Sequence, residues 1–314
     1  MCSKPSYCSS TQTNSRNNPM QRGRFAPSPT GRMHLGNVFS ALLSWLSVKS
    51  RGGEWLLRIE DIDPVRSHQA YADLIMDDLE WLGLPWDAQP VYQSERSDIY
   101  QHYFEQLCEQ GLTYPCYCTR ADLLATQAPH ESDGRVVYKG TCRGLPLRPG
   151  MLAATRLIVP DRVITFTDGH YGHCGVDMMR QVGDFIIRRK DGAWAYQLAV
   201  VVDDALMGIT QVVRGRDLLL SSPQQMYVAG LLGFSAPQFF HFPLLCNASG
   251  QRLSKRDQSL DMAALRQRYE PHALTGLLAF YAGLIPQPEA IAPADLLPLF
   301  SWEKVPQQDI VVSI

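Results

Sequence analysis

The chain has 314 residues, of which 45% are hydrophobic and 19% are charged, and its formal net charge is −2. This composition is typical of a globular protein with a full core, and any nucleic-acid partner must bind a local basic patch rather than the chain as a whole. No apolar run is long enough to span a membrane. Residues 1–21 are rich in Ser, Asn, Gln and Thr, and they predict a disordered tail rather than a secretory leader.

The most informative stretch is residues 24–37, RFAPSPTGRMHLGN. A short strand leads into a proline-rich turn at Gly31, and His34, Gly36 and Asn37 then open a helix. The apolar residues of this helix repeat at the spacing of one buried face: Val38, Ala41, Leu42, Trp45 and Leu46. Free N–H groups at a helix start, together with the helix dipole, attract anions. The sequence therefore predicts an anion site here, with room for a flat ring against Gly36.

A second predicted strand, at residues 55–60, carries Glu60 at its carboxyl end, where ligands bind in open α/β sheets. Helices are predicted at residues 64–82 and 96–110. Asp63 precedes a proline and fits the N-cap of the first of these helices. Glu60 has no such structural explanation, so we expect it to face a ligand.

Residues 114–190 lack a long helical pattern and predict an insertion between two halves of a nucleotide-binding fold. Four of the eight cysteines lie there, and three of them form a cluster in the sequence: Cys116, Cys118 and Cys142. The sequence shows no signal peptide that would direct the chain to an oxidising compartment, so this cluster favours bound zinc over disulfide bonds. The alternative is a set of reduced structural cysteines without a metal. The fourth ligand stays open, and chemistry alone prefers a histidine, His130 or His173, to a tyrosine.

The strand pattern resumes at residues 182–189, 195–202 and 209–213, and the last region, 259–314, is predicted to be helical. We therefore expect five segments: the tail (1–21), a first Rossmann half (22–113), the insertion (114–190), a second Rossmann half (191–258) and a short C-terminal helical region (259–314).

Residues 24–37 resemble the HIGH motif of class I aminoacyl-tRNA synthetases, and the form APSPTG after Arg-Phe resembles the glutamyl branch. Residues 251–256, QRLSKR, resemble the KMSKS loop in its LSK variant. The resemblance implies an α/β fold with a Rossmann-type catalytic domain, and catalytic roles for His34 and Lys255. It also implies the ATP-binding residues His34, Gly36, Asn37, Ser254 and Lys255.

Residues 196–219, YQLAVVVDDALMGITQVVRGRDLL, resemble the second half of the glutamyl catalytic domain. The implied glutamate-binding residues are Arg24, Phe25, Ala26, Pro27, Ser28, Glu60, Tyr196 and Arg214. Val200 is a departure, because ordinary glutamyl synthetases often have an asparagine there. The C-x-C…Y-x-x-x-C arrangement resembles glutamyl-queuosine tRNA(Asp) synthetases, and it implies the zinc ligands Cys116, Cys118, Tyr138 and Cys142.

That family implies a cytoplasmic ligase that activates L-glutamate with ATP and Mg²⁺ and transfers it to queuosine in the anticodon loop of tRNA(Asp). A shortened glutamyl-tRNA synthetase that charges the 3′ end is the nearest alternative. The missing anticodon-reading domain and Val200 weigh against it. A small-molecule nucleotidyltransferase is disfavoured by the joint presence of Arg24, Glu60 and Arg214. An inactive RNA-binding paralogue is disfavoured by the intact HIGH-like and LSK motifs.

Overall fold

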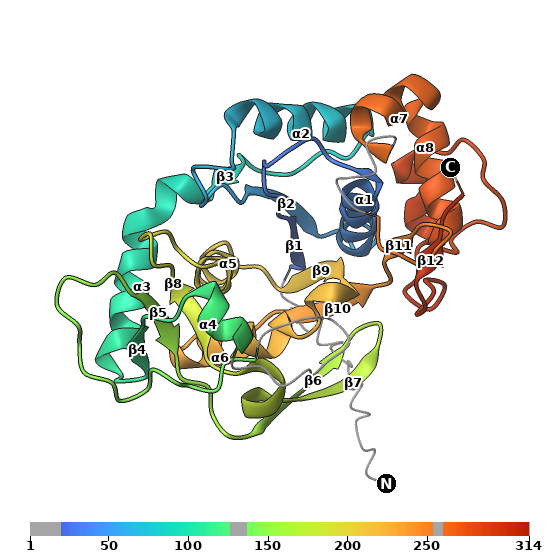
Figure 1. Ribbon diagram of the computed structural model, residues 1–314. Coiled ribbons are helices and arrows are strands. Elements are labelled where there is room, and N and C mark those ends of the chain that lie inside the picture. Colours follow the sequence, from blue (N-terminus) through green and yellow to red (C-terminus); the bar gives the residue numbers. More distant parts are fainter. Residues whose placement is uncertain (1–19, 126–136, 254–259, 314) are drawn as a thin grey trace, which may run out of the picture.

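A parallel sheet of five strands forms the centre of the molecule (Figure 1). The computed structural model describes residues 20–125, 137–253 and 260–313. In spatial order the strands are β10 (Gln238–Phe242), β9 (Gln211–Gly215), β1 (Arg22–Phe25), β2 (Glu54–Ile59) and β3 (Val91–Tyr92). Each neighbouring pair is parallel, which confirms the α/β class predicted from the sequence.

Helix α1 (Leu35–Lys49) follows β1 and packs against the sheet. The apolar face predicted for this helix is confirmed, because Val38, Ala41, Leu42, Trp45 and Leu46 are all buried. Helix and strand approach closely since Gly23 has no side chain, and a Cβ there would lie 2.4 Å from Cγ2 of Val48. This packing fixes the start of α1 beside the end of β1.

The strand order reverses between β1 and β9. The chain adds β2 and β3 on one side of β1, and β9 and β10 lie on the other. In open α/β sheets the loops that leave two such strands diverge and form a crevice for ligands. The crevice should therefore lie beyond Phe25 and Gly215, the last residues of β1 and β9.

The segment between β3 and β9 carries two smaller antiparallel sheets. Its elements are α3 (Ser97–Glu109), β4 (Thr113–Cys116), α4 (Arg120–Ala125), β5 (Ala154–Leu157), β6 (Val163–Asp168), β7 (Gly172–Asp177), a π-helical turn (Met178–Val182), β8 (Phe185–Arg188) and α5 (Tyr196–Leu206). The β6–β7 hairpin lies beside β10 (Figure 1), and the Gly169 N–H donates to the Phe239 carbonyl at 2.8 Å. The hairpin therefore covers an edge strand of the central sheet.

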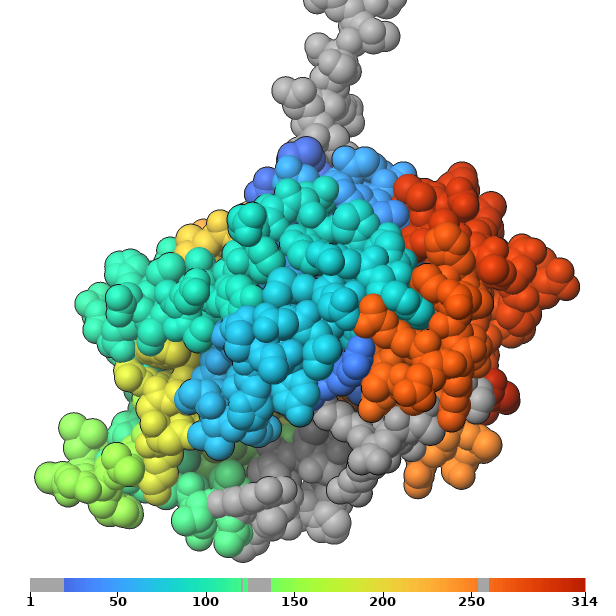
Figure 2. Space-filling model, turned by 90° about the horizontal axis from the view of Figure 1, so that it is seen from above, coloured from blue at the N-terminus to red at the C-terminus, as the bar shows by residue number. Residues whose placement is uncertain are grey.

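Among the described residues, the other helices are α2 (Gln69–Trp81), α6 (Ser221–Leu231), α7 (Met262–Arg268), α8 (Pro271–Tyr281) and the 3-10 turns Gln93–Arg96 and Pro293–Leu299. Seen from above, α2 and α3 (cyan to teal) lie between the orange and red C-terminal elements and the green and yellow segments (Figure 2). A third 3-10 turn, Arg216–Leu218, follows β9, and β11 (Leu245–Cys246) pairs with β12 (Ile310–Val311). Among the described residues, no helix is both long and apolar enough to cross a membrane.

Residues near position 306 hold the tip of the β6–β7 hairpin. His170 Nε2 lies 3.0 Å from the Pro306 carbonyl, and Tyr171 donates its hydroxyl to the Gln307 carbonyl at 2.9 Å. Gln307 in turn donates its amide to the His170 carbonyl at 2.8 Å. Trp302 stacks on Phe240 of β10 and contacts His170. These contacts hold the tip of the hairpin in place beside β10.

The strand predicted at residues 195–202 is wrong, because this run forms most of helix α5. Residues 198–204 are all buried. Burial on every side removes the polar face that would reveal a helical period, and a short run rich in valine then resembles a buried strand. Tyr196 is consequently the first residue of a helix rather than a residue before a strand.

The helix predicted from residue 64 begins later, at Gln69. Asp63 accepts the backbone N–H groups of Val65 and Arg66, at 3.2 and 3.3 Å, within a turn that ends before the helix. It also pairs with Arg66 and Arg189, and its hydrogen bonds from these two arginines lower its pKa to about 2. The capping interpretation of Asp63 is therefore correct for a turn and wrong for α2.

Candidate active site

A cavity of about 520 Å³ opens beyond the carboxyl ends of β1, β2 and β9. Its lining includes eleven of the residues proposed above for glutamate or ATP: Arg24, Phe25, Ala26, Pro27, Ser28, His34, Gly36, Asn37, Glu60, Tyr196 and Arg214. Ser254 and Lys255 lie outside the described residues, but Arg252 and Leu253 directly before them line the cavity. The structure thus brings the two Rossmann halves together around one space.

His34 caps helix α1 at the edge of the cavity. Its Nδ1 accepts the Gly36 N–H at 3.1 Å, and the Asn37 side-chain oxygen accepts the His34 N–H at 3.1 Å. Because Nδ1 is an acceptor, the proton of the neutral ring sits on Nε2. The Nε2–H of the ring and the positive end of helix α1 therefore lie at the same edge of the cavity, which suits a phosphate.

Arg24 belongs to a buried group of charges at the floor of the cavity. Its Nε donates to Asp204 of α5 at 3.1 Å, and Arg58 of β2 donates to the same carboxylate oxygen at 2.6 Å. Arg58 also donates to Glu60 at 3.1 Å. Arg58 is fully buried and also forms an ion pair with Asp203 at 3.8 Å, so two arginines and three carboxylates share one network.

These contacts shift the acids in opposite directions. Burial raises the pKa of Glu60 above its usual range, and Arg58 and Arg24 only partly oppose this. Burial also acts to raise the pKa of Asp204, but the charges of Arg24 and Arg58 outweigh it and lower that pKa. Asp204 is thus the permanent anion of the group, whereas a further cation near Glu60 would stabilise its ionised form.

Arg214 lies on β9 at the other side of the cavity, and its hydrogen-bond partners are uncharged. It donates Nε to His241 Nε2 at 3.1 Å, Nη1 to Gln225 at 2.8 Å and Nη2 to Ser222 at 2.8 Å. The Tyr196 hydroxyl also interacts with the guanidinium. Burial lowers the pKa of Arg214. Within the described parts of the chain, no carboxylate forms an ion pair with it.

Sequence reasoning missed the residues that hold these arginines. Asp204 lies just after the run 195–202, which has the pattern of a strand, and Arg58, Ser222, Gln225 and His241 belong to no motif. One signal was available for Asp204, because a pair of aspartates within a long apolar run is seldom buried without cationic partners. The others are single polar residues with no motif, so only the fold reveals their place.

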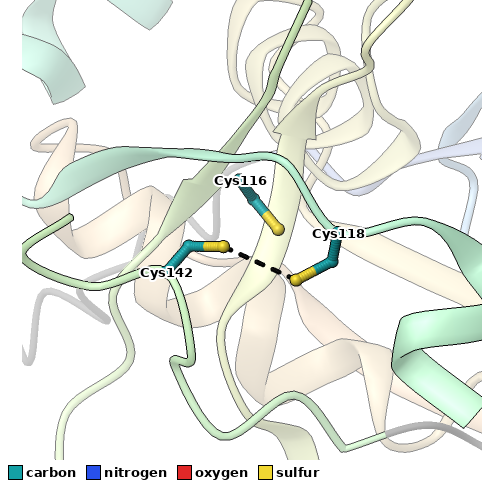
Figure 3. Close-up of side chains that lie close together, drawn as sticks. All are labelled: Cys116, Cys118 and Cys142. Atoms are coloured by element: carbon teal, nitrogen blue, oxygen red, sulfur yellow. Dashed lines mark hydrogen bonds between the residues drawn. The ribbon is translucent and has the colours of Figure 1, made fainter. Parts of the chain in front are cut away.

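Three cysteines converge in the insertion, at the junction of β4 with the following loops (Figure 3). The sulfur atoms of Cys116, Cys118 and Cys142 all lie within 4.8 Å of one another. The Tyr138 hydroxyl lies 3.5 Å from the sulfurs of Cys116 and Cys118. His173 lies on β7 in the separate hairpin, and His130 is outside the described residues.

This cluster suits a tetrahedral zinc ion, because three thiolates and one oxygen can surround a metal of that size. Burial opposes ionisation of Cys142, but hydrogen bonds from Tyr138 and from the Tyr117 backbone lower the pKa of this thiol to about 7. Burial and the thiols raise the pKa of Tyr138. The phenol would therefore bind as a neutral oxygen unless the metal itself removes its proton.

The catalytic-domain model of class I tRNA synthetases (E and Q) matches residues 21–281. A glutamyl-Q tRNA(Asp) synthetase of Nitratidesulfovibrio vulgaris is 46% identical over 93% of this chain and 95% of that protein. One from Neisseria meningitidis is 45% identical over 93% of this chain and 99% of that protein.

Among solved structures, a glutamate tRNA ligase of Elizabethkingia meningosepticum, in complex with its amino acid, superimposes with a TM-score of 0.80. It is 30% identical to this chain, and the match covers 94% of this chain and 67% of that one. Sequence and fold comparisons thus agree on the same catalytic domain.

Proposed function

This chain belongs to the family of glutamyl-Q tRNA(Asp) synthetases, with the catalytic domain of class I tRNA synthetases of the glutamate and glutamine type, and from that premise we propose its reaction. The enzyme is a ligase that activates L-glutamate with ATP and transfers the glutamyl group to queuosine in the anticodon loop of tRNA(Asp). The following paragraphs assign parts of this reaction to residues of the chain.

The observation that carries the proposal is the charge pattern of the cavity. Free glutamate has two carboxylates and one ammonium group. Arg24 and Arg214 line the cavity from two strands, and Glu60 directly follows a third, β2. The forked guanidinium groups suit the carboxylates, and the carboxylate of Glu60 suits the ammonium group. Ser28 and Tyr196 add uncharged hydroxyl groups.

ATP would occupy the side of the cavity formed by the HIGH-like stretch. His34, Gly36 and Asn37 line this side, and the positive end of the helix dipole of α1 lies there and attracts phosphate oxygens. The glutamate α-carboxylate attacks the α-phosphorus, a mixed anhydride forms and pyrophosphate leaves. His34 Nε2 and the Lys255 ammonium stabilise the charge on the phosphate oxygens. Mg²⁺ that arrives with ATP neutralises part of the triphosphate charge.

In the second step a hydroxyl group of the queuosine ring attacks the carbonyl carbon of the anhydride. The new ester bond forms as the bond to the phosphate breaks, AMP leaves with the electron pair, and the hydroxyl proton passes to the departing phosphate or to water. No residue of the chain has to become a nucleophile. The transfer to queuosine is supported by the names of relatives that are 43 to 46% identical to this chain.

We further propose that zinc is bound by Cys116, Cys118, Cys142 and Tyr138. The converging sulfur and oxygen atoms support this assignment. None of these residues lines the glutamate cavity. When bound, zinc would cross-link the insertion and would take no part in the chemistry.

The proposal is tested first by ATP–pyrophosphate exchange with each of the common amino acids, in the presence and absence of tRNA. We expect exchange with glutamate and not with glutamine or aspartate. The purified enzyme is then given labelled glutamate and tRNA pools that contain or lack queuosine. Label should enter only the queuosine-containing pool and should survive removal of the tRNA 3′ end. Label at the 3′ end would instead show a shortened glutamyl-tRNA synthetase.

A further inference from the structure

Arg214 is the end of a buried chain of polar side chains that reaches into the insertion. Its Nε donates to His241 Nε2 on β10 at 3.1 Å, and His241 Nδ1 lies 2.6 Å from Asp168 Oδ2 at the end of β6. His241 is 0% exposed and Asp168 is 2% exposed. The reaction proposed above uses neither residue.

Ser222, His241 and Asp168 resemble a serine–histidine–aspartate arrangement, but their bonding excludes a nucleophilic role. A nucleophilic serine needs a histidine nitrogen free to take its proton, and it needs access to substrate. Ser222 is fully buried, and its Oγ accepts from Arg214 Nη2 at 2.8 Å. His241 Nε2 is 3.3 Å from that oxygen but accepts from Arg214 Nε. The group therefore serves Arg214.

The hydrogen bonds define the protonation of His241. An arginine Nε–H can only donate, so His241 Nε2 has to be an acceptor and carries no proton. The proton of the neutral ring is then on Nδ1, where it is donated to Asp168. Asp168 is itself fixed, because its Oδ1 accepts the N–H groups of His170 and Tyr171 at 3.0 and 2.9 Å.

We propose that Asp168 and His241 are positioning residues that hold the Arg214 guanidinium in the orientation in which it binds a carboxylate of glutamate. This inference rests on the proposed function of Arg214. Asp168 selects the Nδ1–H form of His241, and that form presents the acceptor that fixes Arg214 Nε. The β6–β7 hairpin of the insertion thereby becomes part of the amino-acid site.

The charge state of His241 matters for the same reason. The charged groups that face it are Asp168 from β6, Arg214 from β9 and Asp217 from the turn after β9. Burial lowers the pKa of His241, and Arg214 adds to this effect, while Asp168 opposes it. A protonated His241 would place an N–H against the Arg214 N–H and a second cation beside the first. Acid should therefore weaken glutamate binding through this pair.

Asp168→Asn is the most direct test. Two backbone N–H groups require an oxygen at the Oδ1 position, so the new amide nitrogen must face His241 Nδ1. The histidine proton then moves to Nε2, which opposes Arg214. We expect the KM for glutamate in ATP–pyrophosphate exchange to rise about tenfold or more, the scale of a lost hydrogen bond to a charged group. The KM for ATP should change less than about twofold, since ATP does not contact Arg214 in this scheme.

Two substitutions of His241 distinguish a positioning role from a purely structural one. His241→Gln keeps an acceptor near the position of Nε2, whereas His241→Asn keeps only the donor toward Asp168. The glutamine variant should retain more glutamate affinity than the asparagine variant, at equal thermal stability. In the wild type the KM for glutamate should also rise as the pH falls toward the lowered pKa of His241, and this part of the profile should be missing in His241→Gln.

The outcomes are distinguishable. A wild type without glutamate-dependent exchange overturns the proposed function and, with it, this inference. An active wild type whose glutamate KM is unchanged in Asp168→Asn and equal in both His241 variants overturns the inference alone. If Asp168→Asn does not fold, the His241 pair and its pH profile decide.

Discussion

The two arginines of the cavity are held in contrasting ways. Arg24 donates to Asp204, a carboxylate that it shares with Arg58, so its charge is balanced within the protein. Arg214 donates to Ser222, Gln225 and His241, none of which is an anion at neutral pH. Both side chains are 5% exposed, so the difference lies in their partners and not in their burial.

This contrast separates two roles in recognition of an acidic ligand. A buried cation without a counter-ion is costly in the empty protein, and a ligand carboxylate relieves that cost. Arg214 should therefore provide most of the electrostatic attraction for glutamate. Arg24 offers a guanidinium whose charge is already paired, and its contribution should come more from hydrogen-bond geometry. In the empty site the charge of Arg24 is therefore balanced by a carboxylate of the protein, whereas the charge of Arg214 has no such partner.

The largest effect should follow from breaking the paired side at Arg58. Arg58→Met leaves Glu60, Asp203 and Asp204 with less positive charge around them, and breaking a buried ion network typically costs about 3–5 kcal/mol of folding free energy. On the uncharged side, Ser222→Ala removes one hydrogen bond to Arg214 and should cost about 1–3 kcal/mol. Urea unfolding of both variants measures this difference, and equal losses would contradict the contrast.

The next effect concerns glutamate itself. Arg214→Ala should lower kcat/KM for glutamate in ATP–pyrophosphate exchange by about 10²- to 10³-fold, because a ligand carboxylate loses its unpaired cation in a buried site. Arg24→Ala should lower it less, since Asp204 keeps Arg58 as a partner. Thermal unfolding of both variants controls for misfolding. A greater loss from Arg24→Ala would reverse the assignment of the two roles.

Acid should affect the stability of the two sides with opposite sign. The folded-state pKa of His241 lies below its unfolded value of about 6.5, so the unfolded chain binds the proton first. The contribution of neutral His241 to the free energy of unfolding is complete above about pH 6.5. It decreases as the pH falls below this value, by at most about 1.4 kcal/mol per pH unit. The pKa of Glu60 is raised instead, so the folded chain binds that proton first and gains stability as the pH falls toward about 4.5.

Unfolding free energies between pH 7.5 and 4.5 check this prediction. The difference between wild type and His241→Gln should shrink as the pH falls below about 6.5. The free energy of unfolding of the wild type should instead increase relative to that of Glu60→Gln as the pH falls. Parallel curves for all three proteins would show that neither group titrates differently on folding.

The smallest effect should come from the cysteine cluster, which provides a control remote from both arginines. Cys142→Ser should lower the zinc content measured by metal analysis and loosen the insertion. The KM for glutamate should change by less than about twofold, since no residue of this cluster lines the cavity and distant sites are usually independent. A large change would show that the zinc site supports the hairpin that carries Asp168.

The sequence allowed the lining of the cavity to be predicted, because residues 24–37 form one local strand–turn–helix unit. The residues that orient the two arginines could not be predicted in this way. Arg58 and Asp204 are 146 positions apart, and Asp168 and His241 are 73 apart. Such residues act through a neighbour in space, and no local pattern marks them. The error at residues 195–202 added to this, since a strand would direct Asp203 and Asp204 to opposite faces.

The hairpin contacts near residue 306 have a consequence for how the chain folds. Asp168 is placed by a hairpin whose tip is bonded to Pro306, 136 positions after His170. Contacts over such distances require closure of a long loop and tend to form late in folding. During synthesis, a nascent chain that has not yet reached residue 306 already contains the HIGH-like stretch and Arg214. It lacks the residues that hold the tip of the β6–β7 hairpin. Glutamate recognition should therefore be among the last properties that a newly made molecule acquires.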